Sequence, residues 1–122
     1  MRIEFLYWEE CPSHDEALRR LKEVLQEEGI EDPVEIIRVD TDEDAERLDF
    51  PGSPTIRFNG QDIQPESARR TGSGLTCRAY WVDGRVSPLP TKAMIREALR
   101  RSLQEGGRRA GRQPGDPASA TP

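Results

Sequence analysis

The chain has 122 residues, of which 34% are hydrophobic and 34% are charged, and its formal net charge is −5. This length and composition predict one small domain with a modest core and exclude a large internal cavity. The excess of acids argues against a nucleic-acid binder, which needs a contiguous basic surface. No apolar run approaches the length of a membrane span and no signal peptide is evident, so we expect a soluble, cytoplasmic protein without membrane contact.

The first predicted elements are a strand and a helix. Residues 2–8 contain five apolar or aromatic side chains in seven, which is typical of a buried central strand. Pro12 suits the first turn of a helix, and Ser13 with Glu16 three positions later matches a capping box. Apolar residues then recur at helical spacing until just before Gly29, which suits a left-handed C-cap.

The middle of the chain predicts a second strand, a short helix and a third strand. Residues 34–39 are rich in β-branched side chains, and an acidic helix follows through Leu48. The order strand, helix, strand favours a right-handed crossover and a parallel pair. Residues 50–54 form a rigid loop, and residues 55–60 alternate like a strand with one solvated face.

The last third predicts fewer regular elements. Residues 61–76 read as a long polar loop, residues 77–82 as a fourth strand, and residues 91–104 as a final amphipathic helix. Residues 105–122 lack apolar side chains larger than Ala, so burial cannot offset their ordering entropy. We therefore expect a folded domain over residues 1–104 and a disordered tail over residues 105–122.

Cys11 is the main candidate for chemistry. It follows a polar turn and precedes the first helix, where unpaired N–H groups and the helix dipole favour thiolate over thiol. We expect an exposed, reactive thiol, with a buried structural cysteine as the alternative. His14 is open to three interpretations: a surface histidine, a partner of the thiolate, or a second ligand for a soft metal ion. Without an export signal, free cysteines are the default.

The order of elements, with Cys11-Pro12-Ser13-His14 at the first turn and Ser53-Pro54-Thr55 before the third strand, resembles the thioredoxin family over residues 1–104. The resemblance implies an α/β thioredoxin-like fold with a four-stranded mixed sheet flanked by helices. It also implies that Cys11 is the attacking thiol and that Pro54 is a cis-proline that orients an extended substrate. The residues expected to contact substrate are Trp8, Pro12, Ser13, Ser53, Pro54 and Thr55.

Two departures from the family pattern concern the redox motif. His14 stands where the family has its second cysteine, and Trp8 lies three residues before Cys11 instead of one. The segment Gly74-Leu75-Thr76-Cys77-Arg78 resembles small bacterial thioredoxin-like proteins, some of which carry an alkylmercury lyase label. In the thioredoxin topology Cys77 is expected at the far end of the sheet from Cys11, too distant for a disulfide. The alternative is that the long loop before Cys77 folds back and makes it a resolving thiol or a second metal ligand.

Three functions follow as hypotheses. The first is monothiol exchange, with Cys11 and His14 as catalytic residues and a protein or small-molecule thiol or disulfide as partner; whether the protein is a thiol–disulfide oxidoreductase stays open. The second is a binding module that has the fold without the redox cycle. The third is the handling of a soft metal or organomercurial by Cys11 with His14 or Cys77, in which Asp15 or Glu10 supplies an acid. No cofactor is expected, and the oligomeric state is open.

Overall fold

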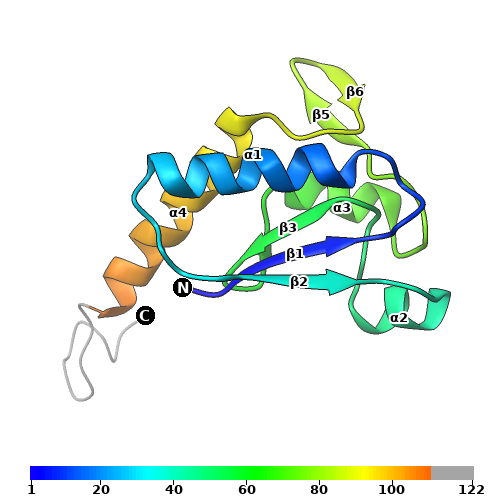
Figure 1. Ribbon diagram of the computed structural model, residues 1–122, viewed down its shortest axis with the longest axis horizontal. Coiled ribbons are helices and arrows are strands. Elements are labelled where there is room, and N and C mark those ends of the chain that lie inside the picture. Colours follow the sequence, from blue (N-terminus) through cyan, green and yellow to red (C-terminus); the bar gives the residue numbers. More distant parts are fainter. Residues whose placement is uncertain (111–122) are drawn as a thin grey trace.

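The computed structural model describes residues 1–110 of the chain. Its centre is a four-stranded mixed sheet with the order β2-β1-β3-β4 (Figure 1). The central strand β1 pairs parallel with β2 and antiparallel with β3, which pairs antiparallel with the short β4. The strands are β1 (Ile3–Tyr7), β2 (Val34–Arg38), β3 (Thr55–Phe58) and β4 (Gln61–Asp62). The first three strands confirm the prediction, and the arrangement is compatible with a thioredoxin-like fold.

Helices lie on both faces of this sheet. The larger core cluster unites side chains of β1 and β3 with α1 (His14–Glu27) and α4 (Lys92–Ala110). A smaller cluster on the other face contains Leu6 of β1 and Ala45 of α2 (Asp42–Arg47). The ribbon in Figure 1 shows α1 running along the sheet, with α2 beyond the end of β2. The turn that joins β1 to α1 is therefore anchored by buried elements on both of its sides.

The first helix forms where predicted, but its N-terminus is capped differently. Ser13 is the N-cap residue, yet its side chain makes no capping hydrogen bond, so the predicted capping box is wrong. The Glu16 carboxylate instead accepts hydrogen bonds from the Arg19 and Arg20 side chains on the next turn. At the other end Gly29 follows the helix with φ +69°, as the C-cap prediction requires.

The segment after β3 differs most from the prediction. The expected loop over residues 61–76 contains β4 and the helix α3 (Pro65–Thr71), whose first residue is the proline that suits this position. The predicted fourth strand over residues 77–82 is also wrong. Only its end is a strand, β5 (Tyr80–Val82), and β5 pairs with β6 (Arg85–Ser87) in a hairpin outside the main sheet (Figure 1).

The C-terminal helix is longer than predicted. It begins at Lys92 and continues to Ala110, past the expected end near residue 104. Most of the predicted tail, residues 111–122, lies outside the described residues. Within residues 1–110, every helix is too short or too polar to cross a membrane.

Candidate functional site

Cys11 lies in the turn between β1 and α1, and it is buried. Its backbone N–H donates to the carbonyl of Trp8 at 3.1 Å, which closes the turn. The side chain is 0% exposed, and its thiol donates to the backbone carbonyl of Ser53 at 3.3 Å. The prediction that Cys11 is an exposed thiol is therefore wrong, because the loop before β3 lies against it.

That loop is buried throughout and holds the predicted proline. Residues 51–55 are all buried, and the Ser53–Pro54 peptide bond is cis, the geometry that the thioredoxin resemblance implies. The Thr55 hydroxyl donates to the Gly52 carbonyl at 2.6 Å, and the Ser53 hydroxyl lies 3.5 Å from the Trp8 carbonyl. The first contact closes the loop on itself, and the second attaches it to the Cys11 turn.

The backbone of Ser53 is paired with the chain's own segment around Cys77. The Ser53 N–H donates to the Thr76 carbonyl and the Arg78 N–H donates to the Ser53 carbonyl, both at 2.8 Å. Ser53 and Cys77 thus form a parallel β-bridge. The groups expected to hold an extended substrate are therefore already occupied by residues 76–78.

This bridge brings the two cysteines together. Cys11 contacts the Ser53 carbonyl and Cys77 is the bridge partner of Ser53, so the expectation that Cys77 lies far from Cys11 is wrong. Cys77 is exposed, whereas Cys11 is not. The pKa of the Cys77 thiol is raised, first by the neighbouring Cys11 and then by partial burial. The two cysteines therefore lie on either side of one residue, Ser53.

A glycine permits this close approach. Gly52 has φ +124°, and a Cβ atom there would lie 3.0 Å from both the N and the Cα of Arg78. Such a distance requires the backbone of the Cys77 segment to shift, because the contact atoms are not a flexible side-chain end. Gly52 is thus needed both for its backbone conformation and for the packing of residues 77–78 against the loop.

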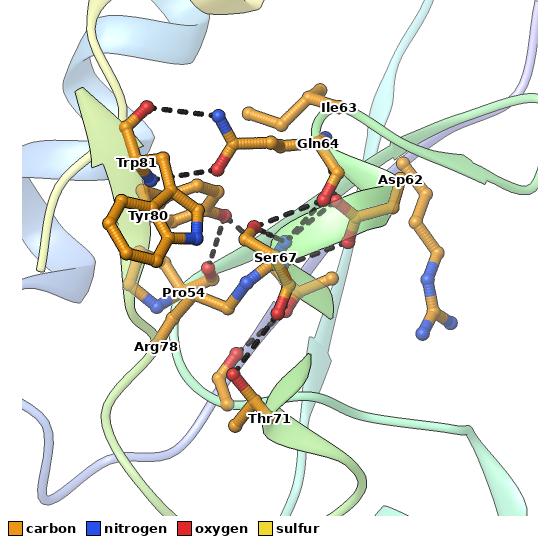
Figure 2. Close-up of polar contacts among 12 residues, drawn as sticks. Pro54, Asp62, Ile63, Gln64, Ser67, Thr71, Arg78, Tyr80 and Trp81 are labelled. Atoms are coloured by element: carbon orange, nitrogen blue, oxygen red, sulfur yellow. Dashed lines mark hydrogen bonds and ion pairs between the residues drawn. The ribbon is translucent and has the colours of Figure 1, made fainter. Parts of the chain in front are cut away.

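Arg78 anchors the same segment from its other side (Figure 2). Its side chain is almost fully buried, and its guanidinium forms a bidentate pair with Asp62 through two 2.8 Å contacts. It also donates to the Ser67 hydroxyl at 2.9 Å, to the Gln64 carbonyl at 3.1 Å and to Thr55 at 3.2 Å. Thr55, Asp62 and Ser67 belong to β3, β4 and α3, so Arg78 ties the segment that follows Cys77 to three elements.

Tyr80 extends this network to the cis-proline. Its hydroxyl donates to the Pro54 carbonyl at 2.6 Å and lies 3.4 Å from the Arg78 guanidinium (Figure 2). Full burial raises the pKa of Tyr80, so the phenol is neutral at physiological pH. Pro54 is therefore held by a donor that does not ionise.

His14 and the other residues of the turn take no part in the cysteine contact. The His14 ring lies 4.8 Å from the Tyr7 ring, and its Nδ1 is 3.3 Å from an Asp15 carboxylate oxygen. Among the contacts of the described residues, His14 makes no hydrogen bond to Cys11. Pro12 is exposed, and Trp8 and Ser13 are half-buried beside the turn.

The residues that the sequence did not single out are Arg78, Asp62 and Tyr80. Arginine and aspartate are usually exposed, so no local pattern indicates that this pair is buried. The one available signal was the position of Arg78 at the end of the Gly-Leu-Thr-Cys-Arg segment. In the described part of the chain, no three His, Cys, Asp or Glu side chains gather as a metal site.

Comparison with known proteins gives a family without an assigned function. A family model described as Domain of unknown function (DUF2703) matches residues 12–99. This match covers more than half of the chain, begins directly after Cys11 and includes Pro54, Cys77 and Arg78. The chain matches no curated protein and no solved structure.

Proposed function

The chain belongs to the DUF2703 family, and from its paired cysteines we propose that it carries out thiol–disulfide exchange through a Cys11–Cys77 couple. The contact of both residues with Ser53 is the observation that carries the proposal. A disulfide needs Cα atoms within about 7 Å, and Ser53 is the common neighbour of both cysteines, since it accepts from the Cys11 thiol and forms the bridge with Cys77. The earlier monothiol hypothesis thereby becomes a dithiol one.

The surrounding residues have distinct tasks in this exchange. In the dithiol form the Ser53 carbonyl accepts the hydrogen of Cys11, which holds that sulfur beside the bridge between Ser53 and Cys77. Gly52 and Arg78 fix the backbone on either side of the Cys77 contact. Pro54 and Tyr80 hold the loop in place. The surface around Cys77 then orients the substrate.

Oxidation of the purified chain followed by peptide mapping tests the proposal. The full chain is equilibrated with mixtures of reduced and oxidised glutathione, quenched by acid, and digested without reductant. We expect a peptide pair linked between Cys11 and Cys77, and a reversible return to two free thiols when reduced glutathione is in excess. Cys77→Ser is the matched control, because it removes the exposed sulfur with little change in volume. Two free thiols in wild type across all mixtures would refute the proposal.

A second candidate function is the binding of a thiophilic metal ion, and the same pair of sulfurs favours it. Thiolates select soft ions, and two thiolates suffice for the two-coordinate geometry of Hg²⁺ or Cu(I). His14 is not needed in this version. Titration with Hg²⁺ would consume both thiols at one ion per chain, and prior oxidation to the disulfide would abolish binding. Loss of only one thiol per ion would contradict a shared site.

A further inference from the structure

We propose that Cys77 is the sulfur that exchanges with the partner, and that Cys11 is the resolving thiol. This inference rests on the proposed exchange function and assigns the order of events within it. It reverses the order implied by the thioredoxin resemblance, in which the cysteine at the helix N-terminus attacks first. Three observations carry it: the exposure of the two sulfurs, the occupation of Ser53, and the properties of the Cys77 thiol.

The two sulfurs differ in how accessible they are to a partner. A thiolate attacks a disulfide in line with the S–S bond, from the side opposite to the sulfur that leaves. Attack on Cys77 therefore requires an open approach to Cys77, and this residue is exposed. Attack on Cys11 requires an approach to a side chain that is 0% exposed and lies against the Ser53 carbonyl. A partner of any size reaches Cys77 first.

The backbone contacts of Ser53 also favour Cys77 as the sulfur that exchanges with the partner. A partner that presented its cysteine to Cys11 as an extended strand would need the N–H and C=O of Ser53. Thr76 and Arg78 already hold these groups, and the buried Arg78 guanidinium resists their displacement. The segment around Cys77 thus occupies the backbone of Ser53, where an extended substrate was expected to bind.

The pKa of the Cys77 thiol also bears on which sulfur leaves when the internal disulfide is cleaved. In thiol–disulfide exchange the sulfur with the lower pKa leaves faster. The pKa of the Cys77 thiol is raised, first by the neighbouring Cys11 and then by partial burial, so Cys77 is a poorer leaving group than an unperturbed thiol. Cleavage of the internal disulfide should therefore expel Cys11 and leave the partner bound to Cys77.

The reaction then has two balanced steps. A partner thiolate attacks Cys77 Sγ, the Cys77–Cys11 bond breaks, and Cys11 leaves as a thiolate that takes a proton from water. A second partner thiolate attacks the partner sulfur of the mixed disulfide and expels the Cys77 thiolate, which is also protonated. Two partner thiols are oxidised to one disulfide and the internal disulfide is reduced to two thiols. Reduction of a partner disulfide follows the same steps in reverse.

Single-cysteine variants test the order, with oxidised glutathione as the probe. Reduced Cys11→Ser and Cys77→Ser are each incubated with the probe and followed by intact mass. We expect Cys11→Ser to accumulate a stable adduct on Cys77. Cys77→Ser should react more than about 100-fold more slowly while folded, because a buried thiol reacts only after local opening. In urea its rate should rise to that of an unfolded thiol, which shows that the probe itself works.

The possible outcomes separate this inference from the proposed function. An adduct on Cys11 that forms in folded Cys77→Ser as fast as the adduct on Cys77 would overturn the order while leaving exchange intact. Failure of wild type to form the internal disulfide, together with no adduct in Cys11→Ser, would overturn both. Cys11→Ala provides a second variant in case the serine hydroxyl disturbs the buried position. Circular dichroism confirms that each variant is folded.

Discussion

At the scale of single residues, Cys77 and Arg78 are neighbours with opposite environments. The Cys77 side chain faces solvent, and the next side chain is buried in a network of five protein groups. An exposed sulfur is ordinarily free to move, but here its backbone is held on one side by Ser53 and on the other by the Arg78 guanidinium. Arg78 is therefore a positioning residue that acts through Cys77.

Substitution of Arg78 tests this role. Arg78→Ala should lower the free energy of unfolding by about 3–5 kcal/mol, because it leaves the Asp62 carboxylate without its buried partner. Arg78→Lys keeps the charge but not the bidentate geometry, and should fall between wild type and Ala. Urea denaturation measures both. The exposed Arg69 is the control, since Arg69→Ala should change stability by no more than about 0.5 kcal/mol.

A second readout distinguishes positioning from stability alone. Under conditions in which Arg78→Lys is fully folded, the rate of Cys11–Cys77 disulfide formation should still be lower than in wild type. An unchanged rate would mean that Arg78 only stabilises the fold.

Gly52 gives a second prediction at this scale. Gly52→Ala should destabilise the fold more than Gly29→Ala does. Both residues have positive φ, which costs a side chain about 1–2 kcal/mol, but a Cβ at Gly29 meets no atom within 4 Å. At Gly52 it also displaces the backbone of Arg78. Thermal unfolding compares the two variants, and only Gly52→Ala should slow disulfide formation; equal effects would argue against a tight contact.

At the scale of elements, α1 and α4 are joined by ion pairs as well as by their apolar faces. Glu27 contacts Lys92 at 2.7 Å and Arg96 at 2.5 Å, and Glu28 contacts Arg100 at 2.9 Å. The pKa of Glu27 is lowered, chiefly by its hydrogen bond from Lys92, and that of Glu28 is lowered, chiefly by its hydrogen bond from Arg100. Two acidic residues at the end of α1 thus meet three basic residues of α4.

These lowered pKa values predict how stability depends on pH. The folded state binds these protons less tightly than the unfolded chain, so the ion pairs contribute fully above the unfolded pKa of about 4.3. Their contribution is lost as the pH falls from there through the folded values. Urea midpoints at pH 7, 5 and 3 should therefore change little in the first interval and fall in the second.

Glu28→Gln should reduce that acid-induced fall, because it removes one of the carboxylates responsible. Glu46→Gln, on the exposed side of α2, is the matched control and should retain the wild-type slope. A fall of the same size in Glu28→Gln would assign the acid sensitivity to other carboxylates. High salt should also weaken the contribution at pH 7, since these pairs are close to solvent.

At the scale of the whole molecule, local patterns predicted the first half of the chain better than the second. β1, α1, β2 and β3 carry clear periodicity, and each was placed within a few residues. β4 has two residues and α3 begins with proline and holds two arginines, so neither shows a strong pattern. The prediction located only β5, the first strand of the hairpin, because an Asp-Gly turn follows it.

The candidate site was likewise predicted only in part from the sequence. Cys11 and Pro54 were located by their motifs, because both lie in short turns between predicted elements. The burial of Cys11 and its contact with Cys77 depend on a bridge between residues 24 positions apart, which no local spacing encodes. The expected strand at residues 77–82 also set Cys77 at the wrong end of the sheet.

The large sequence separation of the cysteines leads to a prediction on global stability. Cys11 and Cys77 are 66 positions apart, so a disulfide between them closes most of the domain into one loop. Loop entropy predicts that oxidation stabilises the folded state by about 4 kcal/mol. Denaturation in guanidinium with and without reductant measures the difference, and Cys77→Ser should show none. Equal midpoints for oxidised and reduced wild type would indicate that the bond strains the native backbone.

The β5–β6 hairpin lies outside the main sheet and is held at one strand by the Gln64 amide, which donates to the Trp81 carbonyl at 3.0 Å and accepts from the Trp81 N–H at 2.9 Å (Figure 2). The Gln64 side chain thus makes the two backbone hydrogen bonds that a neighbouring strand would otherwise make. Because Tyr80 of β5 is fully buried and donates to the Pro54 carbonyl, only the outer part of the hairpin, with the exposed Trp81 and Val86, can open without disturbing the loop beside the cysteines.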